Sequence, residues 1–225
     1  MLPTICVMAS GNGTTMEAIA KACSDGRVGA HVSAVIVDNP GAGAVERAVA
    51  LSLRTVVIER KRLGGEYSAV LLRRLKRISP DLICLAGYMR ILDENIIAPF
   101  SGRILNIHPS LLPAFGGKGM YGDRVHEAVL RSGARKTGCT VHFVTGEVDM
   151  GPVIMQKEVD VLPDDTVETL RERVHREELE LYPRAIFKVL LDMFGQGRDH
   201  KTGSGSHEGE AHLSVRSLLA PVNFD

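Results

Sequence analysis

The sequence predicts an α/β protein with a twisted, mostly parallel β-sheet and helices on both faces of that sheet. Two observations support this fold class. Short runs of consecutive apolar and β-branched residues recur through the first half of the chain, as in strands that are buried on both faces. Segments with apolar residues at helical spacing separate these runs, and this alternation is typical of parallel sheets.

Five strands are expected in the first half of the chain, at residues 4–9, 32–37, 55–58, 81–86 and 103–107. Apolar residues three and four positions apart predict a helix that includes residues 16–23 and another over residues 66–78. Two further strands, at 140–144 and 153–158, are expected to lie side by side because only residues 145–152 connect them.

A long helix is expected from about Thr166 onward. Asp165 and Glu168 have the spacing of a capping box for its first turn. Pro183 lies inside this helix and is expected to kink or split it, because proline cannot donate the backbone hydrogen bond of a helix interior.

The composition changes after Phe194, where residues 195–212 are rich in Gly, Ser, His and charged side chains. Such a segment has little to bury, so residues 195–225 are interpreted as a flexible C-terminal extension of a domain that spans residues 1–194. The histidines at 200, 207 and 212 lack the close spacing of metal ligands, and no metal site is expected.

The overall composition argues against several classes of function. The chain has 225 residues, 44% of them hydrophobic, and its 27 basic side chains balance 27 acidic ones. Proteins that bind nucleic-acid phosphates usually have a basic excess, so no nucleic-acid partner is expected. No apolar run is long enough to span a membrane, and the first residues lack the basic region of a signal peptide. Four cysteines without a C-x-x-C pair indicate free, mostly buried thiols in the reducing cytoplasm.

The first candidate site follows the first expected strand and consists of Gly11, Asn12, Gly13, Thr14 and Thr15. Glycines here allow a tight turn, and the N–H groups that open the next helix can bind an anion. Asp38 closes the second strand as in dinucleotide-binding folds, but Met16 stands where the third glycine of G-x-G-x-x-G belongs. A phosphate-sized anion site is therefore expected, with an ordinary strand–helix turn as the alternative.

Asn106 and His108 form the second candidate site. They are two residues apart at the end of a strand, so both side chains point to the same side, and ligand crevices form at this end of parallel strands. A carboxamide beside an imidazole can stabilise an oxyanion and supply a proton. Asp149, between the last two strands, would favour the charged imidazolium if it faces His108. A structural histidine and an ordinary acidic turn are the alternatives.

Glu178 is the third candidate. It falls on the apolar stripe of the last helix, and His175 lies beside it one turn earlier. A carboxylate at a position that faces the core needs a partner, and the amine of a ligand is one candidate. A glutamate that reaches solvent at the edge of the stripe is the alternative.

Four motifs resemble those of the phosphoribosylglycinamide formyltransferases, folate-dependent enzymes of purine synthesis. They are S-G-N-G-T-T at 10–15, N-I-H-P-S-L-L-P at 106–113, D-M-G-P at 149–152 and E-L-Y-P at 180–183. The resemblance extends over residues 4–193 and implies a Rossmann-like fold, with residues 1–194 as the catalytic domain. The implied reaction transfers a formyl group from 10-formyltetrahydrofolate to the amine of N1-(5-phospho-D-ribosyl)glycinamide without a metal. The implied partners are these small molecules, for a monomer or homodimer.

The resemblance also gives each candidate residue a role. Asn106 and protonated His108 stabilise the tetrahedral oxyanion, while Asp149 keeps His108 charged and helps to move protons through water. Glu178 binds the glycinamide portion of the substrate. The phosphate is bound by the loop of Gly11, Asn12, Gly13, Thr14 and Thr15. The residues on the folate side are Met89, Arg90, Ile91, Leu92, Asn106 and Val144.

Three positions depart from the family's pattern. The family often has Ser-Asn where this chain has Thr-Thr at 14–15, although hydroxyl donors remain. An arginine that often contacts folate aligns with Gly64, and Arg62 or Lys61 would have to replace it. A lysine that is sometimes found one turn before the acid that binds the substrate is His175 here.

Two other enzyme groups share parts of these motifs. Formyltransferases that act on methionyl-tRNA carry a C-terminal nucleic-acid-binding domain, which the length and neutral charge of this chain disfavour. Formyltetrahydrofolate hydrolases carry an N-terminal regulatory domain, whereas the first strand is expected here at residue 4. A non-catalytic nucleotide-binding module is a further alternative, but Asn106, His108 and Asp149 together favour an enzyme.

Overall fold

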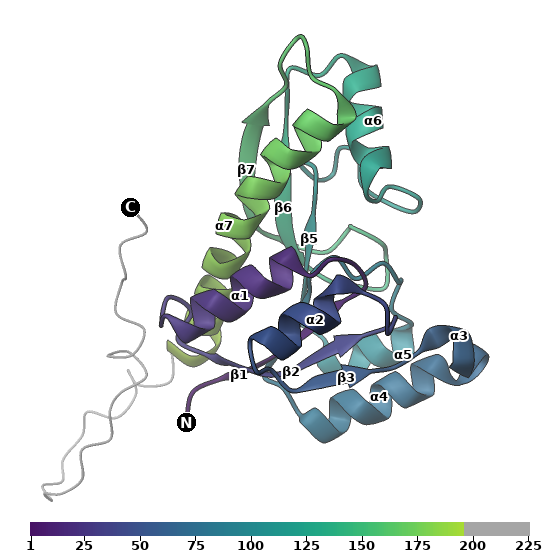
Figure 1. Ribbon diagram of the computed structural model, residues 1–225. Helices are drawn as coiled ribbons and strands as arrows, with labels where there is room; N and C mark the ends of the chain where they lie inside the picture. Colours follow the sequence, from purple (N-terminus) through teal and green to yellow (C-terminus); the bar gives the residue numbers. More distant parts are fainter. Residues whose placement is uncertain (196–225) are drawn as a thin grey trace, which may run out of the picture.

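The computed structural model describes residues 1–195, so all of the extension expected over residues 195–225 except Gly195 lies outside the described residues. Within residues 1–195, seven strands form one sheet in the order β3-β2-β1-β4-β5-β6-β7 (Figure 1). The strands are β1 (Thr4–Ala9), β2 (His31–Val37), β3 (Thr55–Val57), β4 (Leu82–Leu85), β5 (Ile104–His108), β6 (Lys136–Phe143) and β7 (Val153–Asp160). The first five pair in parallel, and β6 runs antiparallel to β5 and β7. The predicted α/β fold with a mostly parallel sheet is confirmed.

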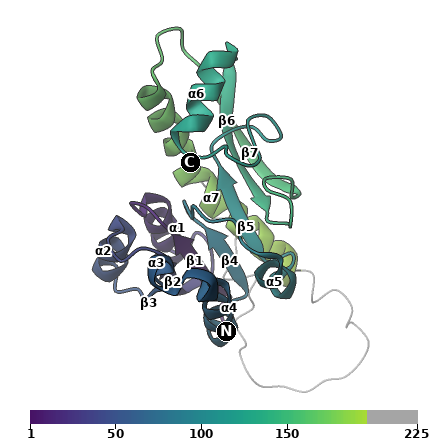
Figure 2. The ribbon, with the colours of Figure 1, turned by 90° about the vertical axis from the view of Figure 1, so that its right-hand side faces the viewer.

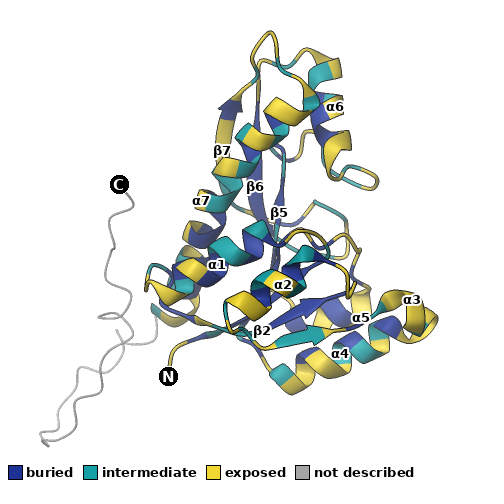
Figure 3. Cartoon of the chain, in the orientation of Figure 1, coloured by how far each residue is buried: buried dark blue, intermediate teal, exposed yellow. Residues whose placement is uncertain are grey.

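Helices cover both faces of the sheet, and each face has its own hydrophobic core. One core contains residues of α1 (Thr14–Ser24), α2 (Gly43–Ala50), α6 (Asp123–Ser132) and α7 (Val167–Gly195). The other contains residues of α4 (Tyr67–Ile78), α5 (Glu94–Ile97) and η2 (Ala98–Phe100), and the short α3 (Arg60–Leu63) packs against it before η1 (Gly64–Glu66). Successive residues of β1 alternate between the two cores, which is the period of a strand. Figure 3 shows the result, with buried strands between helices whose outer faces are exposed.

The order of the strands places a ligand crevice beside β1. The chain passes from β1 to β2 on one side and later places β4 on the other, so the direction of winding reverses between β1 and β4. In open α/β sheets, ligands bind outside the carboxyl ends of the strands at such a point. The glycine loop follows β1 here, and β5 ends nearby at His108, one residue later than predicted. In Figure 2, β6, β7 and α6 stand together above the parallel strands.

The helix α7 begins with a different cap from the predicted one. The Thr166 hydroxyl accepts the Thr169 N–H at 3.2 Å, and the Thr169 hydroxyl accepts the Thr166 N–H at 3.0 Å. This is the reciprocal pattern of a capping box. The predicted box of Asp165 and Glu168 is wrong, because the Asp165 carboxylate instead accepts hydrogen bonds from Arg173 at 2.6 and 2.7 Å.

Pro183 does not split α7, which continues unbroken to Gly195. The neighbouring Tyr182 is fully buried, and its hydroxyl donates to the carbonyl oxygens of Leu105 at 2.9 Å and Leu85 at 3.2 Å. The middle of the helix is therefore fixed to β4 and β5 at the position where proline weakens it. Gly195, which was expected to begin the extension, is the last residue of this helix.

The strand β6 begins at Lys136, four residues before the predicted start. The apolar pattern of this strand does not extend back to Lys136, because Gly138 interrupts it. A Cβ atom at Gly138 would lie 2.0 Å from the carbonyl oxygen of Lys157 in β7, so only glycine permits this close pairing.

The thiols are free, as predicted. Cys6, Cys84 and Cys139 are buried and Cys23 is partly buried, and burial raises the pKa of the Cys6 and Cys23 thiols to about 12. These thiols therefore stay protonated at neutral pH. No helix within residues 1–195 is long and apolar enough to cross a membrane.

Candidate active site

The candidate residues converge on one large cavity at the carboxyl ends of the parallel strands. Its volume is about 960 Å³, at the upper end of the range for small-molecule sites. The cavity extends from the start of α1 to the loop between β6 and β7. Its walls include Gly11, Asn12, Gly13, Thr14, Thr15, Met89, Arg90, Ile91, Leu92, Asn106, His108, Val144, Asp149 and Glu178, which are all the residues selected from the sequence.

His108 is buried at the end of β5, and both of its ring nitrogens face acceptors. Nε2 donates to the carbonyl oxygen of Phe115 at 2.9 Å, and Nδ1 lies 3.5 Å from Oδ2 of Asp149. The Asp149 carboxylate therefore faces the His108 ring, which is the condition that the sequence analysis set for its role beside this histidine.

Asp149 lies between two histidines. Its carboxylate is only 9% exposed; Oδ2 accepts the N–H of Gly117 at 2.9 Å, and Oδ1 is 3.7 Å from Nε2 of His142. The residue adopts a left-handed conformation with φ of 59°, which turns its side chain into the cavity wall. The Asp149 carboxylate therefore lies within 4 Å of both histidines and lines the cavity.

His142 orients Asn106, a relationship that the sequence did not predict. The two residues are opposite each other in the β5–β6 pair, with Nδ2 of Asn106 3.2 Å from Nε2 of His142. Burial lowers the pKa of His142, so the ring is neutral at neutral pH, and its Nδ1 donates to the carbonyl oxygen of Phe143 at 2.9 Å. Nε2 then accepts a hydrogen bond from the Asn106 amide. The second amide hydrogen of Asn106 stays available to a ligand.

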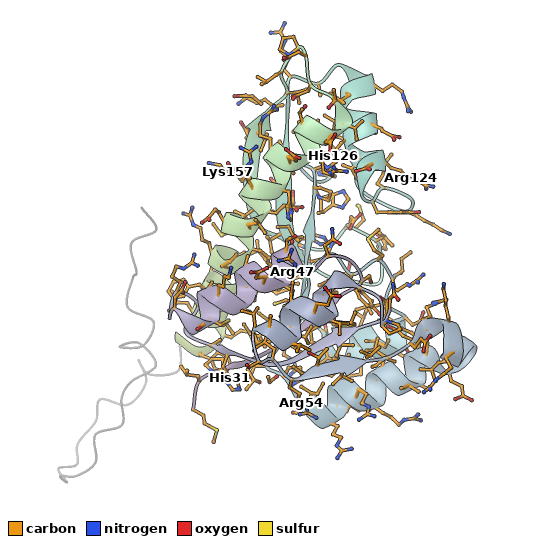
Figure 4. All side chains as sticks on the ribbon, in the orientation of Figure 1. His31, Arg47, Arg54, Arg124, His126 and Lys157 are labelled. Atoms are coloured by element: carbon orange, nitrogen blue, oxygen red, sulfur yellow. The ribbon has the colours of Figure 1, made fainter. Side chains whose placement is uncertain are left out.

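The glycine loop is supported from behind by α2. Gly13 has φ of 79°, and a Cβ atom there would lie 2.6 Å from Cα of Ala44. The Ala44 N–H donates to the carbonyl oxygen of Gly11 at 3.1 Å, and Nε of Arg47 (Figure 4) donates to that of Asn12 at 2.9 Å. These contacts use the carbonyl groups of the loop. The first N–H groups of α1, which have no partner inside the helix, are left to bind an anion.

Glu178, on α7, also lines the cavity. Its side chain is 13% exposed, and Oε2 accepts a hydrogen bond from Nδ1 of His175 at 2.8 Å. The carboxylate therefore does not escape to solvent at the edge of the helix. Oε1 remains for a positively charged or hydrogen-bonding group of a ligand.

Arg90 also lines the cavity, and Asp38 holds its side chain in place. Nε of Arg90 donates to Oδ2 of the buried Asp38 at 3.0 Å. This contact occupies Oδ2 of the carboxylate that a dinucleotide-binding fold would use for ribose, while Oδ1 is buried without a hydrogen-bond partner among the described residues. Lys61 and Arg62 are exposed on α3 and are not among the residues that line the cavity, so neither takes the place of an arginine at Gly64.

His126 is a second cavity residue that the sequence did not predict. It lies on α6 (Figure 4), is 2% exposed, and its Nδ1 has no hydrogen-bond partner within the described part of the chain. Burial lowers the pKa of His126 to about 4, so the ring is neutral at physiological pH. Its position in the amphipathic pattern of α6 is the signal that could have revealed it.

This set of residues suits transfer of an acyl group to a nucleophile. Asn106 and His108 line the cavity together, the Asp149 carboxylate lies beside His108, and the glycine loop that opens α1 lines the same cavity. Among residues 1–195, no group of three or more His, Cys, Asp or Glu side chains is arranged to hold a metal ion.

Comparison with known proteins shows that the chain is similar to formyltransferases. Residues 4–186 match the family model described as formyl transferase. The chloroplastic phosphoribosylglycinamide formyltransferase of Arabidopsis thaliana is 40% identical over 81% of this chain and 63% of that protein. The phosphoribosylglycinamide formyltransferase of Bacillus subtilis (strain 168) is 36% identical over 85% of this chain and 96% of that protein. The chain thus spans less than two thirds of the plant protein and nearly all of the bacterial one.

The fold is found in solved structures as well. The crystal structure of glycinamide ribonucleotide transformylase 1 from Symbiobacterium toebii shares 42% sequence identity with this chain and has a TM-score of 0.77. The match covers 82% of this chain and 86% of that one.

Proposed function

The chain belongs to the formyl transferase family, and we propose that it transfers a formyl group from 10-formyltetrahydrofolate to the amine of N1-(5-phospho-D-ribosyl)glycinamide. The products are tetrahydrofolate and the N-formylated ribonucleotide, an intermediate of purine (IMP) biosynthesis. The observation that carries this proposal is the convergence of Asn106, His108 and Asp149 in a cavity that has an anion loop at one end.

The two substrates enter from opposite sides of these three residues. The ribonucleotide phosphate binds the N–H groups at the start of α1, and Glu178 faces the glycinamide portion. The folate lies against the wall that contains Met89, Arg90, Ile91, Leu92 and Val144. This arrangement brings the amine to the formyl carbon, and holding both reactants in one cavity supplies part of the rate enhancement.

In the first step, the amine nitrogen bonds to the formyl carbon and the carbonyl electron pair moves onto oxygen. The free amide hydrogen of Asn106 and Nε2–H of His108 stabilise this oxyanion. In the structure, the Phe115 carbonyl oxygen accepts that Nε2–H at 2.9 Å. The substrate oxygen must therefore displace the Phe115 carbonyl, whose residue has an unfavourable φ of 54°.

In the second step, protons move and the bond to the folate breaks. The new ammonium group loses one proton to the Asp149 carboxylate through water, and N10 of the folate receives one proton from the same carboxylate. The bond between the formyl carbon and N10 then breaks, its electron pair stays on N10, and the carbonyl group forms again. Asp149 ends the cycle ionised, beside the charged His108.

The test is to follow tetrahydrofolate formation spectroscopically with and without the ribonucleotide. Turnover that strictly requires the amine supports the transferase, and turnover without it indicates a formyltetrahydrofolate hydrolase. Absence of turnover with both substrates, in a protein that binds them, indicates a non-catalytic binding module.

The proposal extends to the organisation of the protein. Residues 1–194 form the catalytic domain of a cytoplasmic enzyme that is a monomer or homodimer and takes only small-molecule substrates. The four free cysteines support a reducing compartment. A chain that ends at Gly195 should remain folded and active, and sedimentation should give the mass of one or two chains.

A further inference from the structure

His175 connects two parts of the proposed ribonucleotide site that come from different helices. Its Nε2 lies 2.8 Å from Oγ1 of Thr14, the first residue of α1, and its Nδ1 lies 2.8 Å from Oε2 of Glu178 on α7. All three side chains line the cavity, and His175 is 34% exposed. The ring thus joins the loop proposed to bind phosphate to the acid proposed to bind the other end of the same molecule.

The partners of His175 determine where its hydrogens lie. The Glu178 carboxylate only accepts hydrogen bonds, so Nδ1 carries a hydrogen. Nε2 then either accepts the hydroxyl hydrogen of Thr14 or carries a second hydrogen and donates to Oγ1. In the first state the Thr14 hydroxyl is committed to the ring. In the second, that hydroxyl hydrogen is free to point at a ligand.

A bound phosphate favours the second state for a simple electrostatic reason. Its negative charge and that of Glu178 both stabilise a doubly protonated ring between them. The Thr14 hydroxyl can then donate to the phosphate while its oxygen accepts from His175. Hydrogen bonds of this kind, with a charged partner, are stronger than those between neutral groups.

Thr14 and His175 come from two different helices, α1 and α7, and contact each other across 161 residues of sequence.

We propose that His175 is a positioning residue for the ribonucleotide, which turns the Thr14 hydroxyl toward the phosphate and fixes the Glu178 carboxylate for the glycinamide end. The inference rests on the proposed function. His175 contacts Thr14 and Glu178, and no hydrogen bond or ion pair of the described residues joins it to Asn106 or His108. Its loss should therefore weaken binding of the ribonucleotide and leave the chemical step nearly intact.

The kinetic test compares His175→Ala, Thr14→Val and the double variant. Each single change should raise KM for the ribonucleotide about tenfold, while kcat stays within about twofold and KM for the folate is unchanged. The double variant should resemble the single ones, because the hydroxyl is oriented only when the ring is present. His175→Gln, whose amide can contact both partners, should recover part of the affinity. His31→Ala, at an exposed histidine on β2, is the control and should change nothing.

A second measurement separates this inference from the proposed function. Calorimetry with inorganic phosphate alone should show about tenfold weaker binding to His175→Ala and Thr14→Val than to the unchanged chain, with no additional loss in the double variant. This result does not depend on catalysis, so it tests His175 even if no formyl transfer is found. Unchanged phosphate affinity, additive losses, or a fall in kcat with an unchanged KM would each overturn the proposal. If His175→Ala fails to fold, Thr14→Val and His175→Gln still decide it.

Discussion

Nδ2 of Asn106 and Nε2 of His142 face each other across β5 and β6 at 3.2 Å. The contact makes a neutral histidine the acceptor that holds the amide in one orientation and leaves its second hydrogen available to a ligand. An oxyanion donor is effective only when it is fixed before the reaction begins. In the proposed mechanism, His142 is therefore expected to act through Asn106.

The first prediction concerns this pair. His142→Phe removes the acceptor and should lower kcat about tenfold, with little change in KM, because the Asn106 amide can then rotate. His142→Gln, whose side-chain oxygen can accept from Asn106, should recover part of the rate. Equal rates in the two variants would show that the ring only fills space.

Asp149 offers a test of the charge beside His108. Asp149→Asn should lower kcat by about a hundredfold or more, because the variant can neither stabilise the imidazolium nor exchange protons. Stability should change little, since asparagine tolerates the φ of 59° and can still accept the Gly117 N–H. Asp149→Ala is the matched comparison, and it should lose stability as well as rate. Near-normal turnover of Asp149→Asn would remove this carboxylate from the mechanism.

The support of the glycine loop predicts a difference between two glycines. Gly13→Ala should reduce the free energy of unfolding by about 1–3 kcal/mol, because φ is 79° and the new Cβ would lie 2.6 Å from Cα of Ala44. Gly11→Ala is the control for stability, since a Cβ atom there has no neighbour within 4 Å. Urea unfolding of both variants measures the difference. Equal stability would mean that α2 can move away from the loop at little cost.

His126 predicts how stability depends on pH. Its pKa is about 4 in the folded chain because of burial, whereas a histidine in the unfolded chain has a value of about 6.5. The unfolded chain therefore binds more protons between these values, and acidification across this range removes about 3 kcal/mol of stability. Above pH 7 the contribution is fully present. The lowered pKa of His142 acts in the same direction.

The measurement is the free energy of unfolding of the unchanged chain and of His126→Leu from pH 8 to pH 4. The two curves should run parallel above about pH 7 and diverge below it, with the unchanged chain losing more stability. Curves that stay parallel over the whole range would show that His126 binds protons equally well in both states.

The parts of the fold that sequence could predict are those with a strong local signal. The strands of the parallel sheet are continuous apolar runs, and α4 repeats its apolar residues regularly. The helix α2 has a weak signal, because its buried residues are the small Ala44 and Ala48. Such a helix is stabilised by tertiary packing more than by its own pattern. The helix α6, by contrast, is amphipathic and buries Val125, His126 and Val129 on one face.

In the candidate site, too, the sequence could predict relationships within one element but not contacts between elements. Asn106 and His108 are two positions apart on one strand, so the period of a strand places them together. The partners from other elements depend on three-dimensional register. His142 reaches Asn106 only because of the register in which β5 pairs with β6. His175 meets Thr14 only because α7 packs on α1. Such contacts leave no periodic trace in the sequence.

The last prediction concerns His108 and its contact with Phe115. His108→Ala removes an oxyanion donor and the charge that Asp149 faces, so kcat should fall by at least about a hundredfold. The same change releases the Phe115 carbonyl, which donates nothing and must find water or another N–H group. Stability should therefore decrease by about 1–3 kcal/mol, the cost of leaving one buried acceptor without its partner. His108→Gln is the matched variant, because its amide can still donate to Phe115 but cannot carry the charge. It should keep the stability of the unchanged chain and lose nearly as much activity as His108→Ala.

Urea unfolding and single-turnover kinetics on both variants separate the effect on stability from the effect on catalysis. If His108→Gln keeps most of the activity, the imidazolium charge is unnecessary, and Asn106 with any neutral donor is enough to stabilise the oxyanion.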